Sequence, residues 1–235
     1  QLILTGDRGP TYSHAYVSLM SGGLVSHGRD ADGNKPPRSI GSSASPLMKR
    51  LAANYNLPPQ ELKKFRLWIE CGAPYAGTYA ALGTGMIGLK LDASLVKDRC
   101  AICHQRDPIG GGELAFNLSR PEKSLVLLAP LAKSAGGYGI CVAASATPAA
   151  AKEKAVFTNT QDADYVKILG SIVAARESLN RQKRFDMPDF KPSVSYVREM
   201  KRYGILPREF DLTSDPVDVY ATDRAYWQSL WWRPM

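Results

Sequence analysis

One pentapeptide constrains this chain more than any other part of its sequence. Residues 100–104 read Cys-Ala-Ile-Cys-His. Two thiols separated by two residues reach the two vinyl groups on one edge of a porphyrin, and the histidine that follows ligates the central iron. The spacing therefore predicts one covalently bound haem c, attached through Cys100 and Cys103, with His104 as an axial ligand of the iron.

Two other chemistries also use closely spaced cysteines. A structural zinc ion would need two further ligands, and the other cysteines and histidines of the chain are not paired at zinc-binding spacing. A thioredoxin-like site would follow a buried strand, whereas residues 94–99 have the pattern of a short amphipathic helix. Haem attachment fits the sequence better than either of them.

Length and composition place few limits on the rest. The 235 residues are enough for one large or two small domains, and the 44% hydrophobic and 22% charged content is ordinary for a globular protein. No apolar run reaches the length of about 18 residues that spans a membrane, so we expect no transmembrane segment. The chain begins at Gln1 without a signal peptide, which predicts a processed or excised piece of a longer protein. Because haem is attached covalently outside the cytoplasm, we expect an extracytoplasmic location.

The net charge of +8 and the pI near 9.3 raise the question of a nucleic-acid partner. Basic residues gather in residues 181–184 and 198–202. Neither cluster is combined with exposed aromatic residues in an RNA- or DNA-binding motif. We interpret both as solvated helix faces or as a docking surface for an acidic redox partner protein, and we expect no nucleic-acid binding.

The hydrophobic periodicity predicts a mainly α-helical fold. Ser45 followed by Pro46 predicts the N-cap and the first residue of a helix. Other helices are expected over residues 13–20, from residue 58 to Gly72, from Thr160 or Asp162 through residue 179, over residues 193–203 and over residues 222–232. We expect a class I cytochrome c-like haem domain over residues 93–235. A smaller, loop-rich helical domain, the tail of an upstream cytochrome-like unit, is expected over residues 1–92.

The second axial position of the iron decides whether a haem transfers electrons or binds a substrate. Residues 187–190 read Met-Pro-Asp-Phe and resemble the Met-Pro-x-Phe loop that carries the distal methionine in class I cytochromes c. We therefore expect Met187 as the sixth ligand, with His14 and His27 as alternatives. An open iron site, and Met187 as an ordinary core methionine, are further alternatives. Aromatic residues that could line the ring are Tyr138, Phe185, Phe190 and Tyr203.

Two cysteines lie outside the pentapeptide. Cys71 and Cys141 both lie beside glycine-rich turns and could form a disulfide in an oxidising compartment. We expect two buried thiols instead, without a bond between them.

Further stretches of the sequence carry a family resemblance. They are residues 67–79, 120–125, 128–133 with 135–137, 184–188, 198–207 and 221–227. Together they resemble the alpha-subunit-like proteins of hydrazine synthase and their planctomycete c-type cytochrome relatives, over most of residues 60–235. The resemblance implies a C-terminal, haem-containing part of a larger subunit, since such proteins usually carry a β-propeller and a first Cys-x-x-Cys-His motif upstream.

The same resemblance implies partners and a compartment. The chain would join other subunits of a multihaem redox complex that makes hydrazine from nitric oxide and ammonium, in the periplasm or the anammoxosome lumen. This haem would be the six-coordinate, electron-transferring one, and the catalytic haem would lie upstream. In the enzyme proper a histidine is expected as its distal ligand, whereas this sequence offers Met187. Two alternatives remain: a catalytic haem that handles NO, hydroxylamine or ammonium, and a structural subunit stabilised by its haem.

Overall fold

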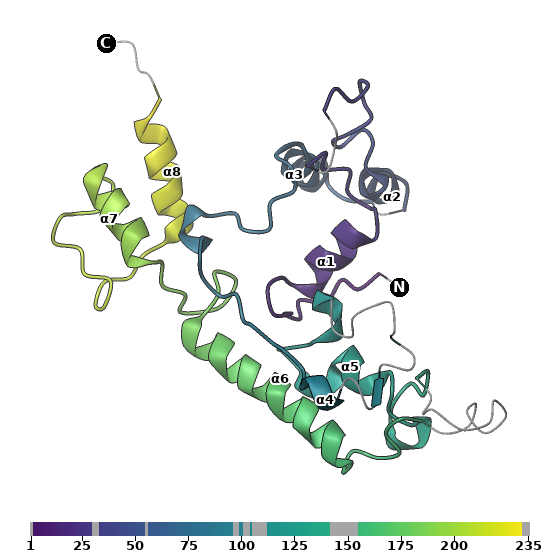
Figure 1. Cartoon of the computed structure of the whole chain (residues 1–235). Coiled ribbons are helices and arrows are strands. Elements are labelled where there is room, and N and C mark those ends of the chain that lie inside the picture. The colour runs from purple at the N-terminus through teal and green to yellow at the C-terminus, as the bar shows by residue number, and fades with distance from the viewer. Residues whose placement is uncertain are drawn as a thin grey trace. The chain divides into compact units, whose positions relative to one another are not determined.

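The computed structural model describes residues 2–29, 33–54, 56–95, 99–100, 104, 112–141 and 155–231. These residues form mainly helices, as predicted, and the β-pairing among them consists of two isolated bridges, Arg8 with Ser13 and Leu131 with Phe157 (Figure 1). Within the described ranges, no helix has both the length and the apolar character needed to cross a membrane.

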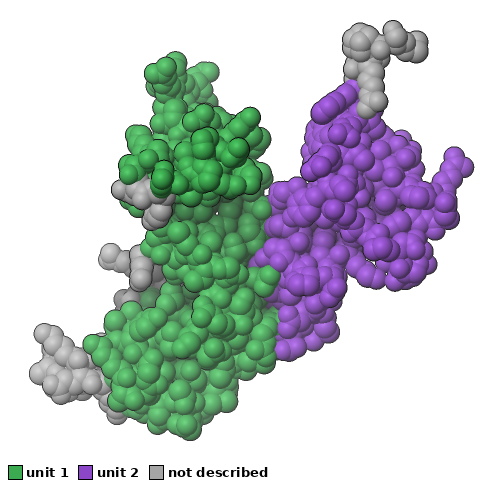
Figure 2. All heavy atoms as spheres, turned by 180° about the vertical axis from the view of Figure 1, so that it is seen from behind, with its two compact units in different colours: residues 1–75, 88–176 green, residues 76–87, 177–235 purple. Residues whose placement is uncertain are grey.

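The chain is divided into two compact units (Figure 2). Unit 1 comprises residues 1–75 and 88–176, and unit 2 comprises residues 76–87 and 177–235. The expected boundary at residues 92 and 93 is therefore not the one along which the chain divides. Each unit draws on segments that are far apart in the sequence, and particular side chains hold those segments together.

Three helices form the first part of unit 1: α1 (His14–Ser21), α2 (Pro46–Asn54) and α3 (Pro59–Glu70). Ser13 caps α1 by accepting a hydrogen bond from the backbone N–H of Tyr16 at 3.3 Å. The chain leaves α3 at Gly72, whose φ of +82° suits glycine and ends the helix where the sequence predicts. The three helices bury an apolar cluster made of Leu24, Val25, Leu47, Ile69 and Ala73, against which Phe65 and Trp68 pack.

Ser45 differs from its predicted role. Its hydroxyl accepts a hydrogen bond from the N–H of Ser26 at 2.9 Å and donates one to the carbonyl of Gly41 at 2.8 Å. The side chain is fully buried and therefore fixes the loop before α2 instead of capping the helix. Pro46 is the first helical residue, as predicted.

The N-terminal segment is joined to residues 113–120. The backbone of Leu118 donates a hydrogen bond to the carbonyl of Arg8 at 2.7 Å. Asp7 accepts hydrogen bonds from the side chains of Asn117 and Arg120, and Glu113 accepts the N–H of Thr11 at 2.7 Å. Burial opposes ionisation of Asp7, but these donors hold the pKa of its carboxyl below the usual range. Residues 7–11 therefore pack with the chain that follows the pentapeptide.

The remainder of unit 1 consists of short elements: α4 (Ala93–Leu95), η3 (Glu113–Ala115), η4 (Pro121–Lys123), α5 (Leu125–Leu128) and η5 (Lys133–Ala135). Phe157 is fully buried and exchanges backbone hydrogen bonds with Pro130 and Ala132 at 3.0 and 2.9 Å. Its ring meets that of Tyr165 edge-on, with centroids 5.8 Å apart. Tyr165 belongs to α6 (Ala163–Gln182), so this contact joins α6 to the segment after α5.

Unit 2 contains α7 (Val194–Arg202), α8 (Val219–Ser229) and the inserted residues 76–87, which include η1 (Tyr79–Ala81). The structure places α7 between Ser193 and Gly204, as the sequence predicts. The start of α8 was predicted at residue 222 but lies at Val219, because the carboxylate of Asp218 accepts the N–H groups of Tyr220 and Ala221 at 3.0 Å.

The buried carboxylate of Asp223 connects all three parts of unit 2. It accepts the hydroxyl of Tyr196 on α7 at 2.6 Å and the backbone N–H of Tyr79 at 3.0 Å. Burial, together with this hydrogen bond to Asp223, raises the pKa of Tyr196, so its hydroxyl remains a donor at neutral pH. Ala80 packs into the same core as Val197 and Met200.

We expect Asp223→Ala to destabilise unit 2 by roughly 1–3 kcal/mol, because the backbone N–H of Tyr79 loses its acceptor and the Tyr196 hydroxyl keeps only its longer bond to the carbonyl of Val219, at 3.4 Å. Urea unfolding followed by tryptophan fluorescence measures this, since residues 177–235 hold three of the chain's four tryptophans. Glu209→Ala, at an exposed position, is the matched control and should change stability by less than about 0.5 kcal/mol. Equal midpoints for the two variants would contradict the role given to Asp223.

Candidate functional site: the Cys-x-x-Cys-His turn

The structure describes two of the three predicted attachment residues. Cys100 and His104 lie in unit 1, whereas residues 101–103, and Cys103 with them, lie outside the described residues. The backbone N–H of His104 donates a hydrogen bond to the carbonyl of Cys100 at 3.1 Å. The donor and the acceptor are four residues apart, the spacing of an i to i+4 hydrogen bond. This bond keeps the backbones of Cys100 and His104 close together.

Arg99, the residue immediately before the pentapeptide, anchors this turn. Its guanidinium donates to the carboxylate of Asp162 at 2.9 Å and lies 3.3 Å from that of Asp164. A further hydrogen bond reaches the carbonyl of Val156 at 2.8 Å, and the cation lies 5.4 Å from the centre of the Phe157 ring. Arg99 therefore fixes the start of the motif against the N-terminus of α6.

Asp162 has a second function in this arrangement. Its other oxygen accepts the backbone N–H groups of Asp164 at 2.9 Å and Tyr165 at 3.4 Å, and so caps α6. Burial opposes its charge, but Arg99 and these N–H groups hold the pKa of Asp162 below its usual range. The carboxylate is thus ionised at neutral pH and available to Arg99.

The described residues fit a covalently attached haem. His104 is exposed. The Cys100 side chain is half-buried. In a c-type haem an imidazole ligates the iron, and cysteine thiols form the thioether bonds to the ring. Within the part of the chain that the structure describes, no three His, Cys, Asp or Glu side chains gather into a metal-binding cluster.

Met187 lies in a tight loop after α6, in unit 2. Its backbone N–H donates to the carbonyl of Arg184 at 2.8 Å, and its sulfur accepts the N–H of Arg184 at 3.4 Å. Arg184 is almost completely buried and pairs with Asp186 at 2.9 Å. A side chain at Gly85 would come within 2.6 Å of that arginine, so only glycine fits there. Met187 and His104 belong to different units, and ligation of one iron by both remains a prediction.

The two alternative distal histidines have other partners. The Nε2 atom of His14, in a buried ring, lies 2.9 Å from the carbonyl of Phe116. Iron binding through this nitrogen would require that hydrogen bond to break. His27 accepts the backbone N–H of Arg29 through Nδ1 at 3.0 Å, which fixes its ring in the loop before α2.

The aromatic residues named as possible ring-lining groups belong to both units. Phe190 packs on the core of unit 2, and the ring of Tyr203 contacts that of Tyr226 at 5.0 Å. Tyr138 lies in unit 1 and is 48% exposed. Phe185 also belongs to unit 2.

Cys71 carries a free thiol, so it is not bonded to Cys141, as predicted. The expected burial is wrong for Cys71, which is exposed at the end of α3, and Cys141 is half-buried. Cys71 is the helix C-cap, a position at which the chain turns outward before Gly72.

Arg99 and its two aspartates were not singled out as site residues from the sequence. An arginine directly before Cys100 was visible, but its partners follow more than 60 residues later. Only Asp162 was named, as a helix cap.

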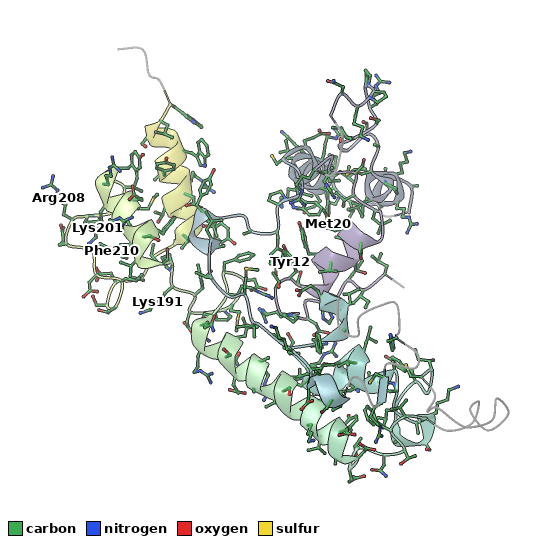
Figure 3. All side chains as sticks on the ribbon, in the orientation of Figure 1. Tyr12, Met20, Lys191, Lys201, Arg208 and Phe210 are labelled. Atoms are coloured by element: carbon green, nitrogen blue, oxygen red, sulfur yellow. The ribbon has the colours of Figure 1, made fainter. Side chains whose placement is uncertain are left out.

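We expect Arg99→Ala to lower the free energy of unfolding by about 1–3 kcal/mol, because two partly buried carboxylates lose their partner. It should also speed exchange of the His104 amide. The stability of Arg99→Lys should lie between that of the unmodified chain and that of Arg99→Ala, since lysine keeps the charge but not the bidentate fork. Urea titration and amide exchange by NMR measure these changes. The control is Arg208→Ala, because the side chain of Arg208 points away from unit 2 (Figure 3). A loss of stability in Arg99→Ala no larger than that in the control would contradict the anchoring role of Arg99.

Family models, curated proteins and solved structures give no match to this chain. The pentapeptide and the geometry of Arg99, Cys100 and His104 therefore carry the functional inference.

Proposed function

We propose that this chain is a c-type haem electron-transfer module, with one haem c attached through Cys100 and Cys103 and ligated by His104. The observation that supports this most directly is the hydrogen bond of 3.1 Å that keeps the backbones of Cys100 and His104 close together. A thiol and an exposed imidazole that lie close together are two of the three groups that the Cys-x-x-Cys-His motif uses to hold a haem.

When bound, a haem c supplies a reversible one-electron couple. The residues of the chain provide its attachment and orientation. The two thiols would tether one edge of the ring, and the imidazole of His104 would hold the iron from one side. Arg99, through Asp162 and Asp164, keeps the start of the motif in place.

Met187 is the proposed sixth ligand, on the basis of the Met-Pro-Asp-Phe sequence. A thioether raises the potential of a haem relative to a second imidazole. The neighbouring Pro188 has a fixed φ and no N–H group, which restricts the loop that presents the sulfur. A filled sixth position favours electron transfer over substrate binding.

The wider setting is proposed from the sequence resemblance. The module would belong to a larger multihaem oxidoreductase that resembles the hydrazine synthase alpha subunit, and other subunits and a redox protein would be its partners. Hydrazine formation would be an activity of that assembly. Covalent haem attachment places the module outside the cytoplasm, in the periplasm or the anammoxosome lumen.

Covalent attachment is tested by coexpressing the chain with a cytochrome c maturation system and extracting the product with acidic acetone. We expect the colour to remain with the protein, and to be lost from it in the variant that carries both Cys100→Ala and Cys103→Ala. Cys71→Ala changes an exposed cysteine outside the motif and should keep the colour. Haem that partitions into the solvent from the unmodified chain would refute the proposal.

The distal ligand is tested separately. Met187→Ala should lower the reduction potential and let the reduced haem bind CO, because the iron loses its thioether ligand. Met86→Ala replaces a methionine that is 66% exposed, also in unit 2, and should leave both properties unchanged. CO binding by the unmodified reduced protein would overturn the assignment and indicate an open iron site.

A further inference from the structure

Unit 2 contains a groove that the haem proposal does not use. The groove has a volume of about 490 Å³ and is lined by residues of η1, α7 and the C-terminal half of α8. This volume falls in the range of small-molecule sites, roughly 300–1,000 Å³.

Aromatic rings form a continuous row along the groove. The ring of Tyr203 lies 5.0 Å from that of Tyr226, which lies 6.1 Å from Trp227, and Trp227 lies 6.1 Å from Tyr79. Tyr79, Tyr203 and Trp227 each leave 48% of their surface exposed. Each of these three rings is therefore packed over part of its surface and exposed over the rest, and all three line the groove.

The groove carries an acidic side chain, although the chain as a whole is basic. The chain has a net charge of +8, yet Glu199 is the one charged residue among the described residues that line the groove. Arg198 and Arg202 pair with its carboxylate at 3.2 and 3.5 Å, but their side chains are 73% and 75% exposed. Such exposed pairs are weak and yield readily to a competing cation.

These features select one ligand chemistry. The face of an aromatic ring carries negative charge and attracts cations, and a carboxylate beside it adds to that attraction. The ring faces and the carboxylate would both repel an anion. A neutral sugar would stack on the rings but leave the carboxylate without a counter-charge.

We propose that the groove of Tyr79, Glu199, Tyr203, Tyr226 and Trp227 binds a quaternary ammonium group. Such a cation is weakly hydrated and is attracted to the faces of aromatic rings. Burial, with Tyr203 and Glu199 nearby, raises the pKa of Tyr226, so that phenol stays neutral at physiological pH.

The test compares choline with 3,3-dimethylbutan-1-ol, which has the same shape without the charge. Isothermal titration of the full chain should show choline binding about tenfold more tightly than the alcohol, the difference expected of cation–π attraction. Equal affinities would show an apolar groove without cation preference. Absence of choline binding would also overturn the proposal, as would binding of a neutral oligosaccharide in its place.

Variants locate the site. Trp227→Leu should weaken choline binding about tenfold, and Glu199→Gln should weaken it several-fold, since each removes one source of attraction. Trp227→Phe keeps a ring face and should retain part of the affinity, which separates loss of the site from misfolding. Trp231→Leu is the matched control, because Trp231 is 64% exposed just beyond α8 and does not line the groove. Equal losses in Trp227→Leu and Trp231→Leu would overturn the assignment.

A second experiment distinguishes whether the quaternary ammonium group belongs to a lipid or to a soluble compound. Sedimentation with phosphatidylcholine vesicles that is lost in Trp227→Leu would identify a lipid headgroup as the ligand. Choline binding without sedimentation would identify a soluble compound.

Discussion

The guanidinium of Arg99 holds together the part of the molecule on which the proposed chemistry depends. It bridges Asp162 and Asp164 and stacks on Phe157, while the next residue in the chain is the first thiol of the pentapeptide. An arginine can do this because its planar fork satisfies two carboxylates at once. A motif that must present two thiols and an imidazole in fixed relation gains from an anchor one residue away, and α6 supplies the rigid support.

Single carboxylates have the same role elsewhere. Asp7 joins the N-terminal segment to residues 117–120, and Asp223 joins Tyr79 to α7. Each is partly or wholly buried and accepts several donors, an arrangement in which loss of the acceptor leaves the donors unsatisfied. These two residues explain why the chain divides into units that are discontinuous in sequence.

The sequence predicts local features well and distant partners poorly. The predicted ranges of α1, α3 and α7 agree with the structure, because the serine caps and glycine stops that bound these helices act within four residues. The predicted capping role of the Ser45 side chain was wrong, because its buried hydroxyl bonds to Ser26 and Gly41. The predicted start of α8 at residue 222 was wrong, because Asp218 caps the helix three residues earlier. The domain boundary and the aromatic groove both depend on contacts across more than 100 residues, which no local pattern reports. The pentapeptide could be recognised from the sequence because the motif is defined by the spacing of its own residues.

The hydrogen bond between Tyr79 and Asp223 also has a consequence for the order of folding. The two residues are 144 positions apart, so unit 2 cannot close until the ribosome has added every residue between them. Contacts of such long sequence separation form late, because the entropy of closing the loop must be overcome first. Until then the residues around Tyr79 and Ala80 lack their core partners. The newly made chain must therefore keep this apolar segment from aggregating while the rest of unit 2 is synthesised.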